Sequence, residues 1–221
     1  YRANMAASME FGEAVAFEHK ASAVTPSGIE IVTKTDKAAE AIIAETLRGL
    51  YPDIPFVGEE CGGSYDHQRF FLVDPLDGTN NFAALRDYFA VCAAYIEDGE
   101  VLAAVVADPC RGTLIKAAAG QGAYFEDTHG PDRKLGLISR NAYADLKAMQ
   151  IDLEISMTHE CDMKPYRSIL EATSGFRKMG STALDLYNMA LGRNMGLIAD
   201  KLAPHDLAAG LLIVREVGGV V

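Results

Sequence analysis

The sequence has no tryptophan, four cysteines and only 8% aromatic residues among its 221 positions. Its cysteines are widely spaced and form no Cys-x-x-Cys pair, which argues against a disulfide framework and a zinc site and favours reduced thiols. No apolar run approaches the roughly 20 residues that a membrane-spanning helix needs, and no signal-peptide pattern opens the chain. We therefore expect a soluble cytoplasmic protein that does not enter a membrane.

Positive charge is also scarce, because 31 Asp and Glu residues face 20 Lys and Arg residues, for a net charge of −11 at pH 7. Such an acidic chain is not expected to bind a nucleic-acid polymer or an anionic membrane surface non-specifically. Phosphorylated small molecules are not excluded, since bound metal ions reverse the sign of the local field. What the chain does have is 49% hydrophobic residues, enough for a sizeable core.

The order of the predicted elements indicates an α+β fold. Asp98 and Gly99 lie between two apolar runs and predict a β-hairpin, which disfavours an all-parallel, doubly wound sheet. We place a soft boundary near Arg140, between an N-terminal α+β part (1–140) and a C-terminal α/β part (141–221). Helices are expected over residues 1–24, 37–50, 165–173, 181–191 and 204–217, and strands over 29–33, 54–57, 69–73, 88–96, 101–107, 112–118, 153–157, 176–179 and 196–199.

Residues 74–79, Asp-Pro-Leu-Asp-Gly-Thr, end an apolar strand with a turn. The carboxylates of Asp74 and Asp77 repel each other unless a cation lies between them or one is protonated. Oxygen ligands of this kind suit Mg²⁺, which binds one or two carboxylates together with waters and substrate phosphate. Gly78 and Thr79 add N–H groups and a hydroxyl that suit a phosphate oxygen or a water. Taken alone, the motif is better explained by a solvated turn.

Further acidic residues stand at the predicted ends of other elements, where side chains can converge. Asp36 lies where a helix begins, Glu59 and Glu60 follow a strand, and Asp206 opens the last helix. Asp36 and Asp206 also suit helix N-caps with no further function, and Glu60 suits a solvated or supporting position. His205, directly before Asp206, is interpreted as a packing residue rather than a metal ligand.

In this order the motifs resemble those of the inositol monophosphatase family of Mg²⁺-dependent, lithium-sensitive phosphatases. The family's central motif, with its following Asn-Phe pair, is intact over residues 74–82, and Asp206 precedes Ala-Ala-Gly as in the family's C-terminal motif, with His205 replacing the usual tryptophan. The resemblance covers roughly residues 29–221. It implies a layered α-β-α-β-α sandwich of the sugar-phosphatase type, with an antiparallel N-terminal sheet and a smaller mixed C-terminal α/β part that is incomplete at its end. It also implies a homodimer.

The resemblance assigns metal ligands residue by residue. Glu59, Asp74 and the carbonyl of Leu76 would hold a first Mg²⁺, while Asp74, Asp77 and Asp206 would hold a second, and a third, weaker ion would lie near Glu59. Phosphate esters hydrolyse slowly because water is a poor nucleophile and the alkoxide is a poor leaving group. One metal ion lowers the pKa of a bound water, and another stabilises the leaving oxygen.

The resemblance also assigns the residues that handle water and substrate. Asp36 and Thr79 would orient the water held by the first ion, which Glu59 helps to bind. Asp200 stands one position after Ala199, which replaces the glutamate that contacts the sugar alcohol in inositol-specific members, so inositol specificity stays open. The expected substrate contacts are Asp77, Gly78, Thr79, Gly180, Ser181, Thr182 and Asp200.

The predicted function is hydrolysis of inositol monophosphate or a similar small phosphate monoester by metal-activated water. Alternatives within the family are fructose 1,6-bisphosphate, histidinol phosphate and 3′-phosphoadenosine 5′-phosphate as substrates. A haloacid-dehalogenase mechanism is disfavoured, because it needs two aspartates two residues apart and here Asp74 and Asp77 are three apart. A non-catalytic, metal-binding regulatory module is the alternative from another class.

Overall fold

The computed structural model describes residues 7, 11, 16–21, 29–127, 130–137, 146–155 and 164–221. A seven-stranded sheet forms its largest layer, in the order β3-β4-β5-β6-β7-β8-β9, and every neighbouring pair is antiparallel except β3 and β4. The strands are β3 (Phe56–Gly58), β4 (Arg69–Asp77), β5 (Ala90–Glu97), β6 (Glu100–Asp108), β7 (Thr113–Ala118), β8 (Gly122–Asp127) and β9 (Arg133–Lys134).

The predicted hairpin is confirmed between β5 and β6. Its two turn residues, Asp98 and Gly99, have φ angles of 51° and 79°. Two successive left-handed residues are typical of the type I′ turn, whose twist matches that of the flanking strands. This short connection makes the middle of the sheet antiparallel, as the sequence predicts.

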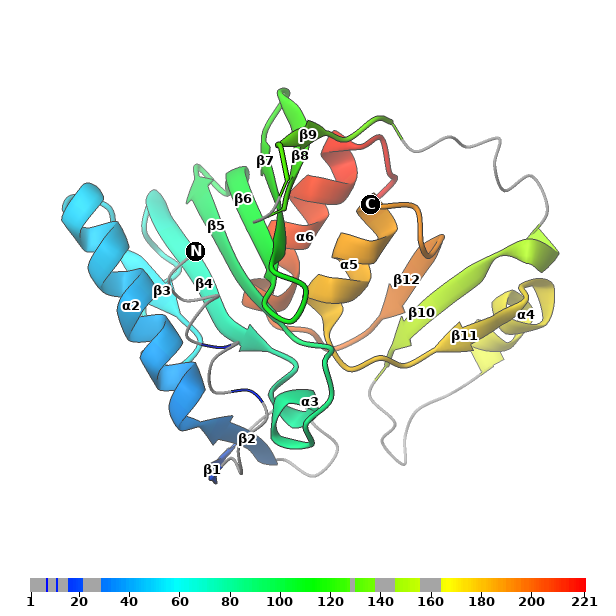
Figure 1. The fold of residues 1–221 in the computed structure, drawn as a ribbon, viewed down its shortest axis with the longest axis horizontal. Coiled ribbons are helices and arrows are strands. Elements are labelled where there is room, and N and C mark those ends of the chain that lie inside the picture. The colour runs from blue at the N-terminus through cyan, green and yellow to red at the C-terminus, as the bar shows by residue number, and fades with distance from the viewer. Residues whose placement is uncertain are drawn as a thin grey trace.

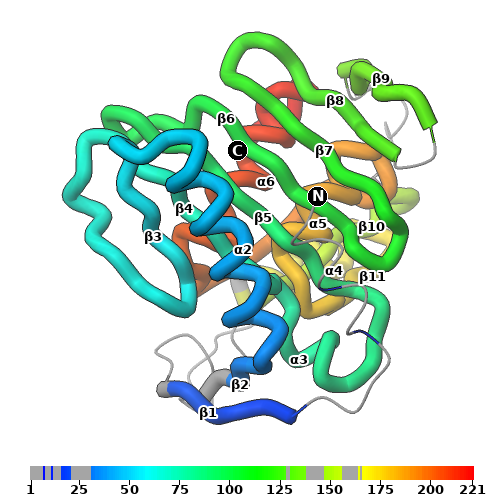
Figure 2. Tube along the Cα trace, turned by 60° about the vertical axis from the view of Figure 1, so that its left-hand side comes forward, coloured from blue at the N-terminus to red at the C-terminus, as the bar shows by residue number. Residues whose placement is uncertain are grey.

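Helices cover both faces of the large sheet. Figure 1 shows α2 (Lys34–Leu50) on one face and α5 (Thr182–Ala190) with α6 (Pro204–Glu216) on the other, and Figure 2 shows α2 lying across β3 and β4. Alternate residues of β5 enter the two cores, since Cys92 packs toward α5 and α6 whereas Val91 packs toward α2. The α5 and α6 helices approach closely at Gly210, where an added Cβ would lie 2.5 Å from Leu186.

A second sheet lies beyond α5 and α6. Its three strands are parallel, in the order β11 (Gly175–Arg177), β10 (Gln150–Glu154) and β12 (Gly196–Ala199), and α4 (Lys164–Ala172) lies on its outer side in Figure 1. The layers therefore run α2, large sheet, α5 with α6, small sheet, α4, which confirms the predicted α-β-α-β-α sandwich. The predicted boundary at Arg140 falls outside the described residues and stays a prediction.

Most predicted elements are present within a few residues, but the N-terminal end differs. The predicted helix over 1–24 is wrong at its end, because Phe17–Ala21 form β1 and pair antiparallel with β2 (Ile29–Thr33), whose backbone supplies the hydrogen bonds. In the rest of the segment 1–24, the structure describes only three residues. Ala7 is helical, whereas Phe11 and Ala16 are not.

The start of α2 is also earlier than predicted. Thr33 is the N-cap, since its Oγ1 accepts a hydrogen bond from Thr35 N at 3.2 Å. Asp36 completes a capping box by accepting one from Thr33 N at 2.8 Å, so Asp36 is a residue of the first turn and not the cap itself.

Four short elements were not predicted at all: α3 (Thr79–Ala83), β8, β9 and the 3-10 helix η2 (Leu146–Ala148). The strand expected over 153–157 is β10, three residues earlier, and residues 156 and 157 lie outside the described residues. Within the described part of the chain, no helix combines the length and apolar character that crossing a bilayer requires.

Candidate active site

Asp74 and Asp77 lie at the end of β4, where its pairing with β5 is irregular. Asp74 is opposite Cys92 and Asp77 is opposite Ala90, so three steps along β4 correspond to two along β5. In a regular strand, residues three apart point to opposite faces, and a bulge of this kind redirects one of them. The irregularity thus lets both carboxylates reach the same side.

Asp206 joins them from the first turn of α6. Carboxylate oxygens of Asp74, Asp77 and Asp206 all lie within 4.8 Å of one another. Asp206 Oδ2 also accepts a hydrogen bond from Ala203 N at 2.9 Å, while its Oδ1 lies 3.4 Å from His205 Nε2. Capping of α6 and membership of this acidic triad therefore coexist in one side chain.

Hydrogen bonds hold two members of the triad in place. Asp77 Oδ2 accepts from Ser181 Oγ at 2.7 Å and from Ala183 N at 2.6 Å, both at the beginning of α5. Asp74 Oδ1 accepts from Leu76 N at 2.9 Å, within β4 itself. The triad is therefore built by three segments of the chain that pack together.

The electrostatics of the triad favour a bound cation. Burial raises the pKa of Asp74 well above its ordinary value, and the nearby charges of Glu59, Asp77 and Asp206 raise it further. Burial and the charge of Asp206 raise the pKa of Asp77 to about 8. Carboxylates this close stay ionised at neutral pH only when a positive charge balances them, and an all-oxygen ligand set suits Mg²⁺. The residues present therefore fit the ion that the sequence predicts.

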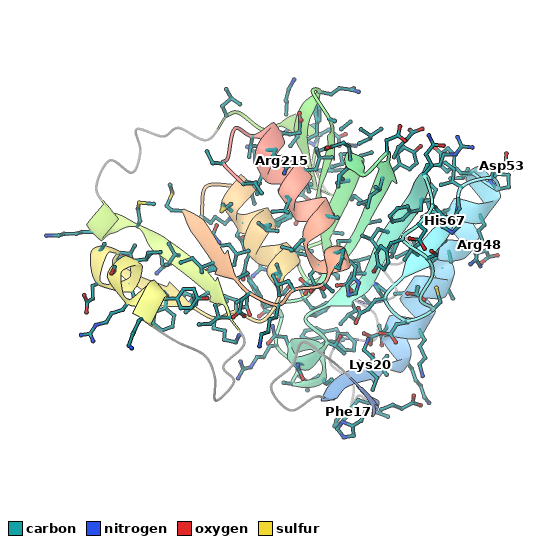
Figure 3. All side chains as sticks on the ribbon, turned by 180° about the vertical axis from the view of Figure 1, so that it is seen from behind. Phe17, Lys20, Arg48, Asp53, His67 and Arg215 are labelled. Atoms are coloured by element: carbon teal, nitrogen blue, oxygen red, sulfur yellow. The ribbon has the colours of Figure 1, made fainter. Side chains whose placement is uncertain are left out.

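Glu59 follows β3 and is held beside β4, with its N–H donating to Val73 O at 3.1 Å. Its carboxylate already has a cationic partner, because Lys20 Nζ lies 2.6 Å from an oxygen of Glu59 and 2.6 Å from one of Glu60. Burial alone would lower the pKa of Lys20, but these two carboxylates outweigh it and raise that pKa. Burial also raises the pKa of Glu60. Figure 3 shows Lys20 inward of Phe17, which lies at the outer rim.

Asp36 and Thr79 also meet, as the sequence predicts. Thr79 Oγ1 lies 3.0 Å from Asp36 Oδ1 and 3.0 Å from the carbonyl oxygen of Leu76, two acceptors that its one proton can serve in turn. Gly78, between Leu76 and Thr79, has a φ angle of 96°. An added Cβ there would lie 3.1 Å from the carbonyl oxygens of Gly180 and Tyr88, so a glycine is required for this close approach.

The sequence profile of the inositol monophosphatase family matches residues 2–221. The chain belongs to the inositol monophosphatase family. Among curated relatives, Nus factor SuhB of Escherichia coli (strain K12) is 37% identical over 194 residues, which cover 87% of this chain and 71% of the relative. Inositol-1-monophosphatase of Rhizobium meliloti is 36% identical over 194 residues, covering 86% and 71%.

Solved structures of the inositol monophosphatase family have the same fold. The extragenic suppressor protein suhB of Bartonella henselae aligns with a TM-score of 0.82 and 33% identity, covering 98% of this chain and 81% of that one. The IMPase of Thermotoga maritima aligns with a TM-score of 0.82 and 28% identity, covering 98% and 79%. Membership supports phosphatase activity, and in this Mg²⁺-dependent family the acidic triad is the group that suits the metal.

A cavity of about 760 Å³ opens over the triad. Most of the residues that the family motifs predict to form the site line this cavity, whereas Asp36, Glu60 and Ser181 do not. The predicted residues that line it are Glu59, Asp74, Leu76, Asp77, Gly78, Thr79, Gly180, Thr182, Asp200 and Asp206. The structure thus brings together segments from both the N-terminal and the C-terminal parts of the chain.

The cavity also contains residues that the sequence did not single out. Four are cationic and one is a carboxylate at the end of β10: Lys20, Arg86, Lys178, Lys201 and Glu154. No sequence signal marked them, because Lys20, Lys178 and Glu154 lie within predicted elements and Arg86 and Lys201 lie between them, as many surface residues do. His205 lines the cavity too, and its Nδ1 is buried with no hydrogen-bond partner among the described residues.

Proposed function

We propose that this chain is a Mg²⁺-dependent phosphomonoesterase that hydrolyses inositol monophosphate or a similar small phosphate monoester. The observation that carries the proposal is the convergence of Asp74, Asp77 and Asp206 within 4.8 Å in a chain of a phosphatase family. Buried like charges are costly without a cation. A phosphate ester is a natural ligand of such a centre, because Mg²⁺ sites commonly take substrate phosphate.

The triad, together with Glu59 and the carbonyl of Leu76, would hold the ions, two or three per site. Bound metal supplies a more acidic water near neutral pH and stabilisation of the leaving oxygen. Ser181 and Ala183 orient Asp77 through its Oδ2. A preorganised carboxylate does not have to be rearranged during the reaction. Its full electrostatic effect is therefore available to stabilise the transition state.

Asp36 and Thr79 orient the attacking water in this proposal. Because Thr79 Oγ1 donates to Asp36 Oδ1 at 3.0 Å, its lone pairs can accept a hydrogen bond from a water. Burial raises the pKa of Asp36, and a more basic carboxylate accepts a proton more readily. Gly78 leaves room beside Thr79 for the phosphate, and Gly180 and Thr182 face the leaving alcohol.

The direct test is phosphate release from a panel of monoesters by the purified chain. With Mg²⁺ we expect turnover of inositol 1-phosphate or another member of the panel, loss of turnover with a chelator, and inhibition by Li⁺. The panel should include fructose 1,6-bisphosphate, histidinol phosphate and 3′-phosphoadenosine 5′-phosphate. Absence of hydrolysis across the panel, from protein that binds Mg²⁺, would reject the proposal.

A second candidate is a non-catalytic, metal-binding regulatory role, which the name Nus factor of several relatives favours. It predicts Mg²⁺ binding without turnover of any panel substrate. We further propose that the chain acts as a cytoplasmic homodimer that binds no nucleic-acid polymer. Light scattering of the purified protein measures the oligomeric state, and titration with labelled RNA and DNA tests the absence of nucleic-acid binding.

A further inference from the structure

The small sheet supplies the wall of the cavity that faces the acidic triad. Its strands β10, β11 and β12 are parallel, so their carboxyl ends meet at one edge. Ligands of α/β sheets commonly bind outside such an edge. Glu154 ends β10, Lys178 follows β11, and Asp200 with Lys201 follows β12, and all four line the cavity.

Lys178 is held in place at this edge. Its Nζ lies 3.3 Å from Glu154 Oε2 and donates a hydrogen bond to the carbonyl oxygen of Ile155 at 3.0 Å, while 51% of the side chain remains exposed. The other oxygen of Glu154 accepts from Gly180 N at 2.7 Å. The Glu154 carboxylate is therefore fully engaged by the chain, and the exposed side of the Lys178 ammonium group faces the solvent-filled space of the cavity.

Two further cations line the same cavity from separate loops. Arg86 follows α3, and Lys201 lies between β12 and α6 with a left-handed φ angle of 52°. Within the described residues, neither side chain forms an ion pair. A long non-glycine residue in this backbone conformation is uncommon. The cavity lining therefore carries the cationic groups of Lys178, Lys201 and Arg86 beside the carboxylates of Glu154 and Asp200, in a chain whose net charge is −11.

We propose that the leaving alcohol of the substrate carries a second anionic group, a phosphate or a carboxylate, which Lys178, Lys201 and Arg86 receive. This inference rests on the proposed phosphomonoesterase function and narrows its substrate class. The cavity volume of about 760 Å³ lies within the range of roughly 300–1,000 Å³ that is usual for small-ligand sites, so a sugar carrying two phosphates fits by size. An uncharged polyol would leave Lys201 and Arg86, which form no ion pair within the described residues, without an anionic partner.

The test compares kcat/KM for fructose 1,6-bisphosphate, which carries a second phosphate, for 3-phosphoglycerate, which carries a carboxylate, and for the uncharged-alcohol ester inositol 1-phosphate. We expect kcat/KM for at least one of the two probes with an anionic leaving alcohol to exceed that for inositol 1-phosphate about tenfold or more, mainly through a lower KM. Which probe prevails distinguishes phosphate from carboxylate. The preference should shrink as ionic strength rises, because exposed charges are screened.

Substitution of the cations should reduce this preference. The ratio to follow is kcat/KM for the preferred anionic probe divided by kcat/KM for inositol 1-phosphate. Lys178→Met and Lys201→Met are each expected to lower this ratio about tenfold, with a smaller loss for Arg86→Met. Lys178→Arg keeps the positive charge and should restore most of the ratio, which separates charge from an altered fold. Arg215→Met is the matched control, because Arg215 is exposed at the far end of α6 from Asp206, as Figure 3 shows.

The outcomes separate the two proposals. Hydrolysis of inositol 1-phosphate at least as efficient as that of both probes with an anionic leaving alcohol overturns this inference, as does a preference unchanged in all three Met variants. Either result leaves the phosphomonoesterase proposal standing. Failure to hydrolyse any probe in the presence of Mg²⁺ overturns both.

Discussion

The two sides of the cavity differ in charge and in burial. On the side of the large sheet, Asp74 is only 1% exposed and every hydrogen bond that orients the acids comes from the chain itself. On the side of the small sheet, Lys178 and Lys201 are exposed and lie on the loops that follow β11 and β12. Buried groups keep one geometry, whereas exposed long side chains adapt to their ligand.

This difference suggests a division of labour. The reacting phosphate needs charges fixed to within a fraction of an ångström, which a buried strand end provides. The leaving group differs from substrate to substrate, and loops change without disturbing the core. If the division holds, substitutions on the large-sheet side should change the reaction rate, and those on the small-sheet side should change substrate preference.

The largest effect is expected from Asp77→Asn, on the large-sheet side. It removes one of the three charges of the triad but preserves an acceptor for Ser181 and Ala183. Turnover should fall about a hundredfold or more, with an unfolding transition close to that of the wild type. Asp53→Asn is the matched control, since Asp53 is exposed near the far end of α2 in Figure 3. Activity of Asp77→Asn near that of the control would reject the triad as the reaction centre.

Thr79→Ala tests the proposed role of the Thr79 hydroxyl in orienting the attacking water. Losing the hydroxyl breaks the link to Asp36, and we expect kcat to fall roughly 10- to 100-fold with a small change in KM. Thr79→Ser keeps the hydroxyl and should retain most of the rate. A loss of equal size in both variants would indicate that the methyl group, and not the hydroxyl, matters.

Asp185→Asn tests how a buried carboxyl group on α5, the helix layer between the two sheets, affects stability. Asp185 lies on α5, fully buried, and its Oδ1 accepts a hydrogen bond from Tyr88 OH at 2.6 Å. Burial raises its pKa from the ordinary 3.8 to about 8. A raised pKa means that the folded state keeps a proton that the unfolded state releases, so this stabilisation is complete below pH 4 and is lost as the pH rises toward 8.

Denaturant unfolding of metal-free protein measures this effect. The free energy of unfolding of the wild type should fall by a few kcal/mol, roughly, between pH 4 and pH 8 relative to the Asp185→Asn variant, whose amide does not titrate. Parallel pH profiles for the two proteins would show that Asp185 does not keep its proton in the folded state.

The smallest effect is expected from Lys20→Met. Lys20 forms an ion pair with Glu59 in the structure, so a metal ion that binds Glu59 must compete with the Lys20 ammonium group. We expect the variant to bind Mg²⁺ several-fold more tightly by calorimetry, because a nearby positive charge is removed. Lys37→Met is the control, since Lys37 pairs with Glu18 on the surface. Weaker Mg²⁺ binding in Lys20→Met than in the control would contradict this expectation.

Much of the fold follows from local signals. The apolar run of β4, the Asp98-Gly99 turn and the Pro204 start of α6 are each specified by neighbouring residues, and all three are present. The helix predicted from the alanine-rich N-terminal segment is wrong over β1. Helix propensity is a weak preference, and pairing with β2 outweighs it there. The short α3 had no periodic pattern that could reveal it.

The acids of the site could be predicted because each stands at an element end with a recognisable motif. The cations of the opposite wall could not, because a lysine after a short strand looks like any solvated lysine. Only the parallel arrangement of β10, β11 and β12 places Lys178 and Lys201 at one edge. The contact of Lys20 with Glu59 was likewise invisible, since it joins β1 to a distant loop.

From the sequence by itself, the turn residues predicted where β4 ends, and the resemblance of the motifs around Asp74, Asp77 and Asp206 to those of one family implied that the three act together, because such motifs are local properties of the chain. Tertiary structure decided that their oxygens lie within 4.8 Å of one another and that cations face them. Distances between separate segments depend on how helices and sheets pack, and burial then sets the pKa of each carboxyl group.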